Sequence, residues 1–289
     1  MNEQTERINI LDLPDDLSDS ICAHITHFTV ALLRVFVDAN IEKVHLIGSG
    51  TLVIVNDSPS ILTAEHVLAQ LRGSDQLGLL TSFRGNLHRY TFDQDHIVVH
   101  KIAKGDDDSK GPDIGLITLP KTNIGRLRAE KSFFNIDKRR ERFRKGFIKS
   151  DRGFWFTCGF PGEFEVDLTP ERGFAAIKGY QGLCGISGIR KEFDDSGYDY
   201  LEMSIEYDSF NPELPASFGG VSGSGVWQVP LSKTSGGHLE ADEYVLSGIV
   251  FYQTKLEGNH RFIRCHGRRV VYEILPIYLN KILIERTHR

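Results

Sequence analysis

The hydrophobic positions of this chain fall into short runs of β-branched and aromatic residues, separated by clusters of glycine, aspartate, asparagine and serine. Runs of this length between turn-forming residues are typical of β-strands. They fall into two groups, which indicates two sheet-rich units. The first group comprises 28–37, 44–47, 51–55, 77–83, 89–92, 96–100 and 114–119, and the second 155–160, 175–180, 198–207, 225–229, 244–252 and 261–265.

The two ends of the chain follow a helical pattern instead. Residues 14–16 read Pro-Asp-Asp, a helix-start signal, and Leu17, Ile21 and Ile25 then recur at four-residue spacing. This predicts a short amphipathic helix, and we interpret 28–37 as a strand rather than as its continuation. Apolar residues also recur at helical spacing between residues 271 and 283, which predicts a C-terminal helix packed on a barrel or a domain junction.

A basic segment separates the two groups of strands. Residues 138–145 read Lys-Arg-Arg-Glu-Arg-Phe-Arg-Lys, with few strand-forming residues around them. This favours a solvated surface connection over a docking site for an acidic partner or RNA. We therefore predict an N-terminal extension (1–26), a first β-barrel (27–125), a basic connection (126–152), a second β-barrel (153–267) and a C-terminal helix (268–289).

Composition excludes several classes of protein. Hydrophobic residues make up 40% and charged residues 25% of the 289 positions, which is the balance of an ordinary globular protein. The net charge of −5 gives no overall basic field, so nucleic acid and membrane are not expected partners. The first 20 residues carry no apolar leader segment, and the four cysteines are scattered without a CxxC pair. We expect a cytoplasmic protein with reduced thiols and no metal site.

Three short segments carry residue types that act together in acyl transfer. Residues 61–67 bring His66 to the end of an apolar strand, residues 111–119 begin a buried-looking strand with Asp113, and residues 219–227 surround Ser222 with glycines. A serine hydroxyl is a weak nucleophile at neutral pH, so it needs a base, and the base needs a group that orients it. The sequence thus offers a nucleophile, a base and an orienting carboxylate.

The motifs around these residues resemble those of the trypsin-like, chymotrypsin-fold serine peptidases, particularly the bacterial branch. Thr63-Ala64-Glu65-His66 is similar to the histidine motif, Asp113-Ile114-Gly115-Leu116 to the aspartate motif, and Gly220-Val221-Ser222-Gly223-Ser224 to the nucleophile motif. The order His, Asp, Ser along the chain is also that of chymotrypsin. Further similarity lies in residues 48–53, 158–162 and 246–252, so the resemblance covers about residues 44–265.

The resemblance implies two six-stranded antiparallel β-barrels and a serine endopeptidase that acts on peptides or proteins through an acyl-enzyme intermediate, without a cofactor. It implies that His66 is the base, that Asp113 orients it, and that Ser222 is the nucleophile. The backbone amides of Gly220 and Ser222 would form the oxyanion hole. Six positions before the nucleophile, Ala216 would lie in the specificity pocket, with Phe251 and Tyr252 as its walls, which favours small or apolar side chains at the cleaved position.

Two departures from the family motifs leave alternatives open. Glu65 replaces an alanine, and Val221 replaces the aspartate that pairs with a newly cut N-terminus in secreted animal enzymes. Activation by such a cut is therefore not expected, and a regulatory protein partner is a hypothesis. A catalytically inactive binding module and an esterase that uses the same triad are the alternative functions. Ser224, the neighbouring serine, is expected to pack behind Ser222.

Overall fold

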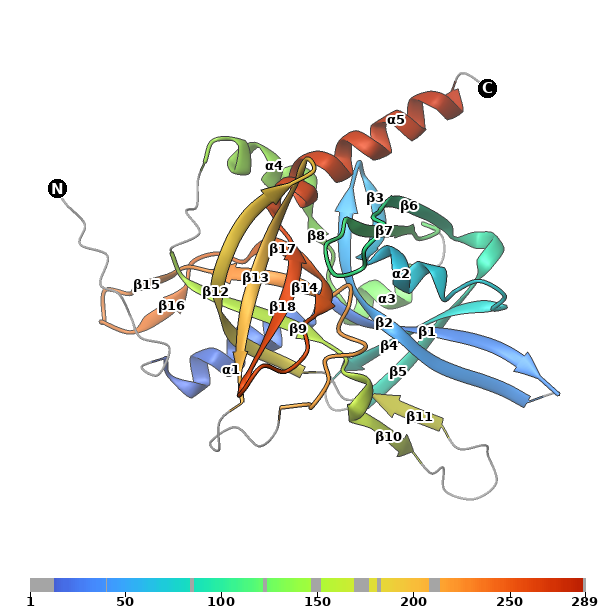
Figure 1. Ribbon diagram of the computed structural model, residues 1–289, viewed down its shortest axis with the longest axis horizontal. Coiled ribbons are helices and arrows are strands. Elements are labelled where there is room, and N and C mark those ends of the chain that lie inside the picture. Colours follow the sequence, from blue (N-terminus) through green and yellow to red (C-terminus); the bar gives the residue numbers. More distant parts are fainter. Residues whose placement is uncertain are drawn as a thin grey trace.

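The computed structural model (Figure 1) describes residues 13–39, 41–83, 86–121, 124–146, 152–168, 177–180, 183–207 and 214–287. Among these residues, no helix has both the length and the apolar composition needed to cross a membrane.

The first unit is an eight-stranded sheet built almost entirely from antiparallel pairs. Its strand order is β5-β4-β1-β2-β3-β7-β6, and β8 pairs with β2 in parallel. The strand predicted at 28–37 is confirmed as β1, and β2 runs continuously through two glycines that separate two of the predicted runs. The strands are β1 (Thr29–Asp38), β2 (Ile41–Val55), β3 (Ser58–Thr63), β4 (Gln76–Phe83), β5 (Asn86–Asp93), β6 (Val98–Lys104), β7 (Asp113–Thr118) and β8 (Phe134–Asn135).

The second unit is a closed six-stranded antiparallel barrel with the order β12-β13-β18-β17-β14-β9. Two small hairpins, β10 with β11 and β15 with β16, extend from it. The prediction of an all-β fold made of antiparallel sheets is confirmed, but the first unit has eight strands instead of the predicted six, because β5 and β8 extend it. The strands are β9 (Phe154–Gly159), β10 (Glu165–Leu168), β11 (Ile177–Tyr180), β12 (Leu183–Asp195), β13 (Tyr198–Glu206), β14 (Gly225–Val229), β15 (Leu231–Lys233), β16 (Leu239–Ala241), β17 (Val245–Gln253) and β18 (His260–His266).

The predicted terminal helices are present as α1 (Asp15–Thr26) and α5 (Leu275–Thr287). A π-helical turn (Val270–Ile274) precedes α5. Leu275 and Leu279 are buried, whereas Ile277 is 58% exposed, because α5 extends outward from the junction of the two units (Figure 1). The expectation that the whole apolar stripe packs on the body is therefore wrong. Short helices also occur at α2 (Glu65–Ala69) and α3 (Gly125–Glu130), with 3₁₀ turns at Gln94–His96 and Gly162–Phe164.

The basic segment is not a simple solvated linker. Its residues form α4 (Ile136–Arg144). Asn135 caps the start of this helix, since its side chain accepts a hydrogen bond from the Lys138 amide. A side-chain oxygen at this position satisfies one of the amides that the first turn of a helix leaves without a partner. The helix packs through Phe143, whose ring stacks on buried Tyr272 at a centroid distance of 5.0 Å.

Aromatic side chains join the two units. Trp227 of the barrel is fully buried, and its ring stacks on Phe28 at 5.1 Å and meets Phe134 of β8 edge-on at 5.2 Å. Buried aromatic pairs of this kind contribute about 0.5–1.5 kcal/mol each beyond the area that they bury. Trp227 lies on β14, the strand that directly follows the loop carrying Ser222, so this contact anchors the strand after that loop.

Candidate active site

The structure brings His66, Asp113 and Ser222 to one cavity of about 820 Å³. His66 lies on α2 just after β3, and Asp113 is the first residue of β7. These two strands are neighbours, with Thr63 opposite Gly115, so the sheet register places the histidine beside the aspartate. Ser222 comes from the loop before β14 of the other unit.

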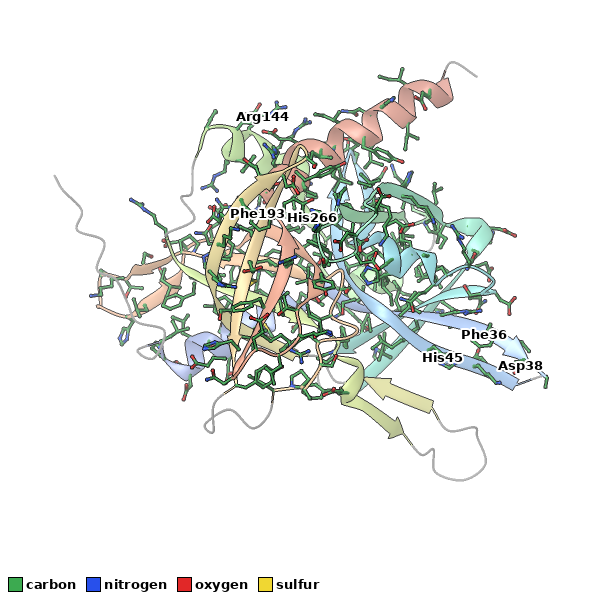
Figure 2. The ribbon with its side chains drawn as sticks, viewed as in Figure 1. Phe36, Asp38, His45, Arg144, Phe193 and His266 are labelled. Carbon is green, nitrogen blue, oxygen red and sulfur yellow. The ribbon has the colours of Figure 1, made fainter. Side chains whose placement is uncertain are left out.

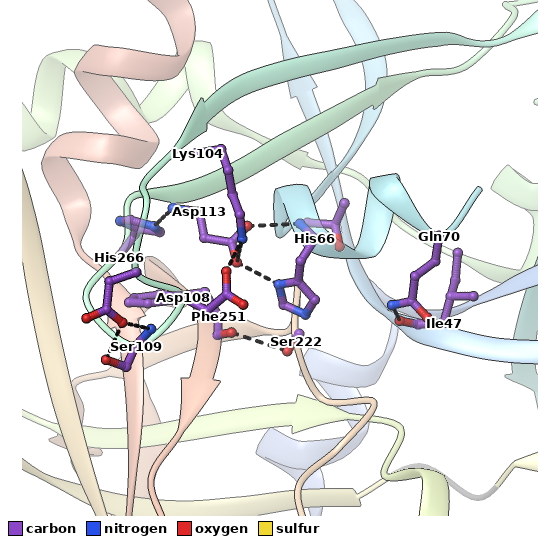
Figure 3. A network of polar contacts seen from close by, with 12 residues as sticks. Ile47, His66, Gln70, Lys104, Asp108, Ser109, Asp113, Ser222, Phe251 and His266 are labelled. Atoms are coloured by element: carbon purple, nitrogen blue, oxygen red, sulfur yellow. Dashed lines mark hydrogen bonds and ion pairs between the residues drawn. The ribbon is translucent and has the colours of Figure 1, made fainter. Parts of the chain in front are cut away.

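Asp113 fixes the orientation of the His66 ring (Figure 3). Its Oδ2 lies 2.6 Å from His66 Nδ1, and its Oδ1 accepts a 3.0 Å hydrogen bond from the His66 amide. Burial raises the pKa of Asp113, but the hydrogen bonds and charge of His66 and the charge of Lys104 outweigh it, so its pKa lies below the ordinary value. The group is therefore a carboxylate, Nδ1 carries the proton, and Nε2 is available as a base.

Charged neighbours surround the aspartate on the side of the first sheet. Lys104 Nζ lies 3.7 Å from Asp113 Oδ2 and also bonds to Asp108. Glu65, the departure from the family motif, is 6% exposed and forms a 2.8 Å ion pair with Lys101. The carboxylate of Glu65 is thus paired with Lys101, a different lysine from the one beside Asp113.

The loop around Ser222 leaves two backbone amides available to a ligand. Within the described part of the chain, neither the Gly220 nor the Ser222 amide donates to a protein acceptor, whereas the amides of Val221, Gly223 and Ser224 all do. Gly220 and Gly223 adopt φ angles of +95° and +94°, which favour glycine. Two free amides on a tight turn are the arrangement that stabilises an oxyanion.

The Ser222 hydroxyl donates to the Phe251 carbonyl at 3.4 Å, and no hydrogen bond to His66 occurs among the described residues (Figure 3). This bond is long and therefore weak. Phe251 is the extra residue of a β-bulge, because β17 and β18 pair Val250 with Cys265 and then Tyr252 with Arg264. The bulge leaves its carbonyl facing the nucleophile loop.

Ser49 of β2 connects this loop to the first unit, a role that the sequence motif did not reveal. Its hydroxyl donates to the Gly220 carbonyl at 2.7 Å and accepts from the Phe160 amide at 2.9 Å. Its backbone amide donates to the Ser222 carbonyl at 2.8 Å. Ser49 is fully buried, so these bonds are shielded from water and set the conformation of residues 220–222.

We expect Ser49→Ala to lower the free energy of unfolding by about 1–3 kcal/mol, because it leaves the Phe160 amide and the Gly220 carbonyl without their partner. We also expect kcat to fall by at least tenfold, since the Gly220 amide loses its support. Ser60→Ala is the matched control, because Ser60 is equally buried in the same sheet but lies away from the cavity. Urea unfolding and turnover of both variants test this, and an equal loss of turnover in both would contradict it.

His266 holds the backbone of Asp113 in place. The sequence motifs do not predict this residue. Its Nε2 accepts a 3.0 Å hydrogen bond from the Asp113 amide, and its ring stacks on Phe251 at 4.6 Å. Figure 2 places it in the interior, between the two units. Burial lowers the pKa of His266 to about 3, against the opposing effect of Asp113, so the ring is neutral near pH 7 and its Nε2 is an acceptor.

This buried histidine predicts a specific acid sensitivity. In the unfolded chain His266 binds a proton near its ordinary pKa of 6.5, whereas in the folded protein it stays neutral down to about pH 3, so acid favours unfolding. We expect the free energy of unfolding to fall by about 2 kcal/mol between pH 7 and pH 5 because of this residue alone. Chemical unfolding of wild type and His266→Gln at both pH values measures it. Equal pH dependence in the two proteins would contradict the assignment.

Two of the three predicted substrate-binding residues line the cavity. These two residues are Phe251 and Tyr252. The Phe251 ring packs on His266, and it is the Phe251 carbonyl that accepts the hydrogen bond from Ser222. Ala216 does not line the cavity: it is exposed, and the lining residues of its loop begin at Ser217. Phe218, two residues further along the loop, is buried in the barrel core.

Gln253 at the end of β17 bridges the two sides of this pocket. Its Oε1 accepts from the Phe218 amide at 2.8 Å and from Arg261 at 2.6 Å, and its Nε2 donates to Ser217 Oγ at 2.9 Å. The side-chain oxygen therefore has both of its acceptor positions filled. Gln253 itself lines the cavity beside Tyr252, so these hydrogen bonds fix one part of the cavity wall.

Together, the mostly antiparallel first sheet and the closed second barrel make an all-β fold. No family model and no curated protein matches the chain. Among solved structures, one match is a chain from a Sesbania mosaic virus structure that concerns the coupled folding and binding of the intrinsically disordered VPg protein. The two chains share 12% identity with a TM-score of 0.40, and the match covers 85% of this chain and 89% of that one. A tobacco etch virus protease mutant matches with 12% identity and a TM-score of 0.37, covering 87% of this chain and 78% of that one.

Proposed function

We propose that this protein is a serine endopeptidase in which Ser222 attacks the peptide carbonyl, His66 is the general base and Asp113 orients the histidine. The observation that carries this proposal is the common cavity, where the His66–Asp113 pair at 2.6 Å and Ser222 beside two free amides lie together. The proposed chemistry uses these side chains and needs no cofactor.

Substrate binding prepares the nucleophile. An extended peptide lies along the end of β17, where its N–H group donates to the Phe251 carbonyl. This displaces the weak hydrogen bond from Ser222, whose hydroxyl then turns by rotation about its Cα–Cβ bond toward His66 Nε2. Hydrogen bonds between catalytic groups are often long before substrate binds, which agrees with the 3.4 Å contact to Phe251.

The reaction then proceeds through an acyl-enzyme. Ser222 Oγ bonds to the substrate carbonyl carbon while its proton passes to His66 Nε2, and the imidazolium is stabilised by the Asp113 carboxylate. The amides of Gly220 and Ser222 stabilise the negative oxygen of the tetrahedral intermediate. His66 returns the proton to the leaving amine as the peptide bond breaks, and water releases the acyl group by the same steps in reverse.

The test is cleavage of unfolded protein by purified wild type beside Ser222→Ala, with new N-termini identified by mass spectrometry. We expect the wild type to cleave the substrate and Ser222→Ala not to cleave it. Turnover of a model ester without any peptide cleavage would favour the esterase alternative. Binding of peptide by both proteins without turnover would favour a binding module.

We expect the pocket bridged by Gln253 to select small side chains at the cleaved position. Replacing Gln253 by alanine removes the bridge, and the preference for alanine over phenylalanine at that position is expected to fall by about 10- to 100-fold. Gln70→Ala is the matched control, because Gln70 lines the same cavity but donates to the Ile47 carbonyl instead. Values of kcat/KM for a pair of peptides test this, and an unchanged preference in Gln253→Ala would contradict it.

Regulation by a partner protein is part of the proposal. Val221 is 2% exposed and packs in the barrel core, so no carboxylate there can pair with a newly cut N-terminus. All four cysteines are free thiols, which supports a cytoplasmic enzyme. Cleavage that rises when cell lysate is added would support a partner, and equally fast cleavage by the purified protein would contradict it.

A further inference from the structure

A second cavity lies where α4 packs against the π-helical turn before α5 (Figure 1). Its described lining comes from α4, from the residues at the start of β17 and from the turn region 268–272, and it shares no residue with the lining of the cavity that holds Ser222. Its volume is about 70 Å³. This is room for about two water molecules, at roughly 30 Å³ each, or for one tetrahedral oxyanion.

Positive charge outnumbers negative charge around this cavity. The charged residues among its described lining are three arginines (Arg139, Arg142 and Arg268) and one carboxylate (Glu243). Arg142 Nη1 donates to Glu243 Oε1 at 2.7 Å, and Arg139 Nη1 lies 3.8 Å from the same oxygen. Two guanidinium groups therefore meet on one carboxylate oxygen, and the excess of positive charge favours an anion in the cavity.

The hydroxyl of Tyr272 is a buried donor that lacks an acceptor. Tyr272 lines the cavity and is 1% exposed, and its oxygen has no hydrogen-bond partner among the described residues. Burial raises the pKa of Tyr272, against the charges of Arg139 and Arg268, so the hydroxyl stays protonated and can donate. Buried polar groups nearly always have a hydrogen-bond partner, so this donor calls for an acceptor in the cavity.

Arg268 is held at the cavity by contacts with the second barrel. Its Nε donates to Ser247 Oγ at 3.0 Å, and its guanidinium carbon lies 5.8 Å from the centroid of the Trp155 ring. Because these contacts already order the side chain, little conformational entropy is lost when it binds a ligand. Burial lowers the pKa of Arg268, and a bound anion would favour its charged form.

We propose that this cavity binds one tetrahedral oxyanion of the size of phosphate, held by the guanidinium groups of the three arginines and by the Tyr272 hydroxyl. Guanidinium groups match the geometry of phosphate oxygens and bind them through paired hydrogen bonds. Each guanidinium group carries five N–H donors, so pairing with Glu243 does not prevent anion binding. The anion links α4 to the turn before α5, and the site is independent of the proposed peptidase function.

The test is isothermal titration calorimetry of the folded full-length chain with inorganic phosphate, beside chloride at the same ionic strength. We expect saturable binding of one phosphate per chain and no saturable binding of chloride. In Tyr272→Phe we expect the affinity for phosphate to fall by about 10- to 100-fold, because a hydrogen bond to a charged group is lost. This variant removes only an oxygen without a described partner, so it should stay folded, which circular dichroism and the urea midpoint check.

Two variants of α4 separate a built site from a general effect of charge. Arg139→Gln removes a cavity residue, whereas Arg144→Gln removes the same charge from an exposed residue of the same helix that does not line the cavity (Figure 2). We expect Arg139→Gln to weaken phosphate binding several-fold and Arg144→Gln to leave it nearly unchanged. Equal loss in both, unchanged affinity in Tyr272→Phe, or no saturable binding to the wild type would overturn the proposal.

Discussion

Replacing Ser222 by alanine is expected to lower kcat/KM by roughly 10⁶-fold, because the nucleophile, base and orienting group act as one unit and loss of the nucleophile removes nearly all of its contribution. The oxyanion amides and substrate binding would remain, so affinity for peptide should change little. The measurement is steady-state hydrolysis of a peptide identified from the unfolded-protein digest.

Ser224→Ala is the matched control for this prediction. Ser224 lies two residues further along the same loop, is fully buried, and has no hydrogen-bond partner for its hydroxyl among the described residues. We expect its turnover to stay within about tenfold of the wild type, since alanine removes an unpaired polar atom from the interior. If Ser224→Ala were inactive and Ser222→Ala active, the nucleophile assignment would be wrong.

Asp113→Asn is expected to lower kcat by roughly 10⁴-fold with little change in the fold, because the amide cannot stabilise the imidazolium and favours the wrong His66 tautomer. Asp108→Asn is the matched control. Asp108 also lines the cavity and bonds the same Lys104, but the described part of the chain shows no hydrogen bond or ion pair between it and His66. Turnover of both variants near pH 8 tests this, and similar rates for Asp113→Asn and Asp108→Asn would contradict the orienting role.

Three local motifs predict residues that the structure brings together. His66, Asp113 and Ser222 come from three separate segments, and all three line one cavity. The strand runs likewise predicted antiparallel sheets, because alternating β-branched segments and glycine-rich turns are local signals. The same reasoning correctly predicted helices at both ends of the chain.

Contacts between distant residues could not be predicted in this way. Ser49 meets Gly220 across 171 positions, and Asp113 meets His266 across 153, so neither pair produces a local pattern. A count of residues back from Ser222 does not reveal that Ala216 lies off the cavity wall. Cys158 and Cys184 likewise lie opposite each other only because β9 pairs with β12.

The sequence carries a local signal for the helix in the basic segment. Its nine residues are almost all polar, so they lack the apolar stripe that reveals an amphipathic helix. Asn135, however, is a favourable residue at the start of a helix. It lies three positions before Lys138, and its side-chain oxygen accepts a hydrogen bond from the Lys138 amide. A search for such starting residues would have predicted a helix here.

The central claim is that Ser222 is an activated nucleophile, and covalent labelling with a fluorophosphonate tests it most directly. Wild type and Ser222→Ala, both shown to be folded, would be treated with the probe and mapped by mass spectrometry. The account predicts a single adduct on Ser222 in the wild type, no adduct in the variant, and loss of labelling in His66→Ala. A folded wild type that stays unlabelled, with and without cell lysate, would contradict the account.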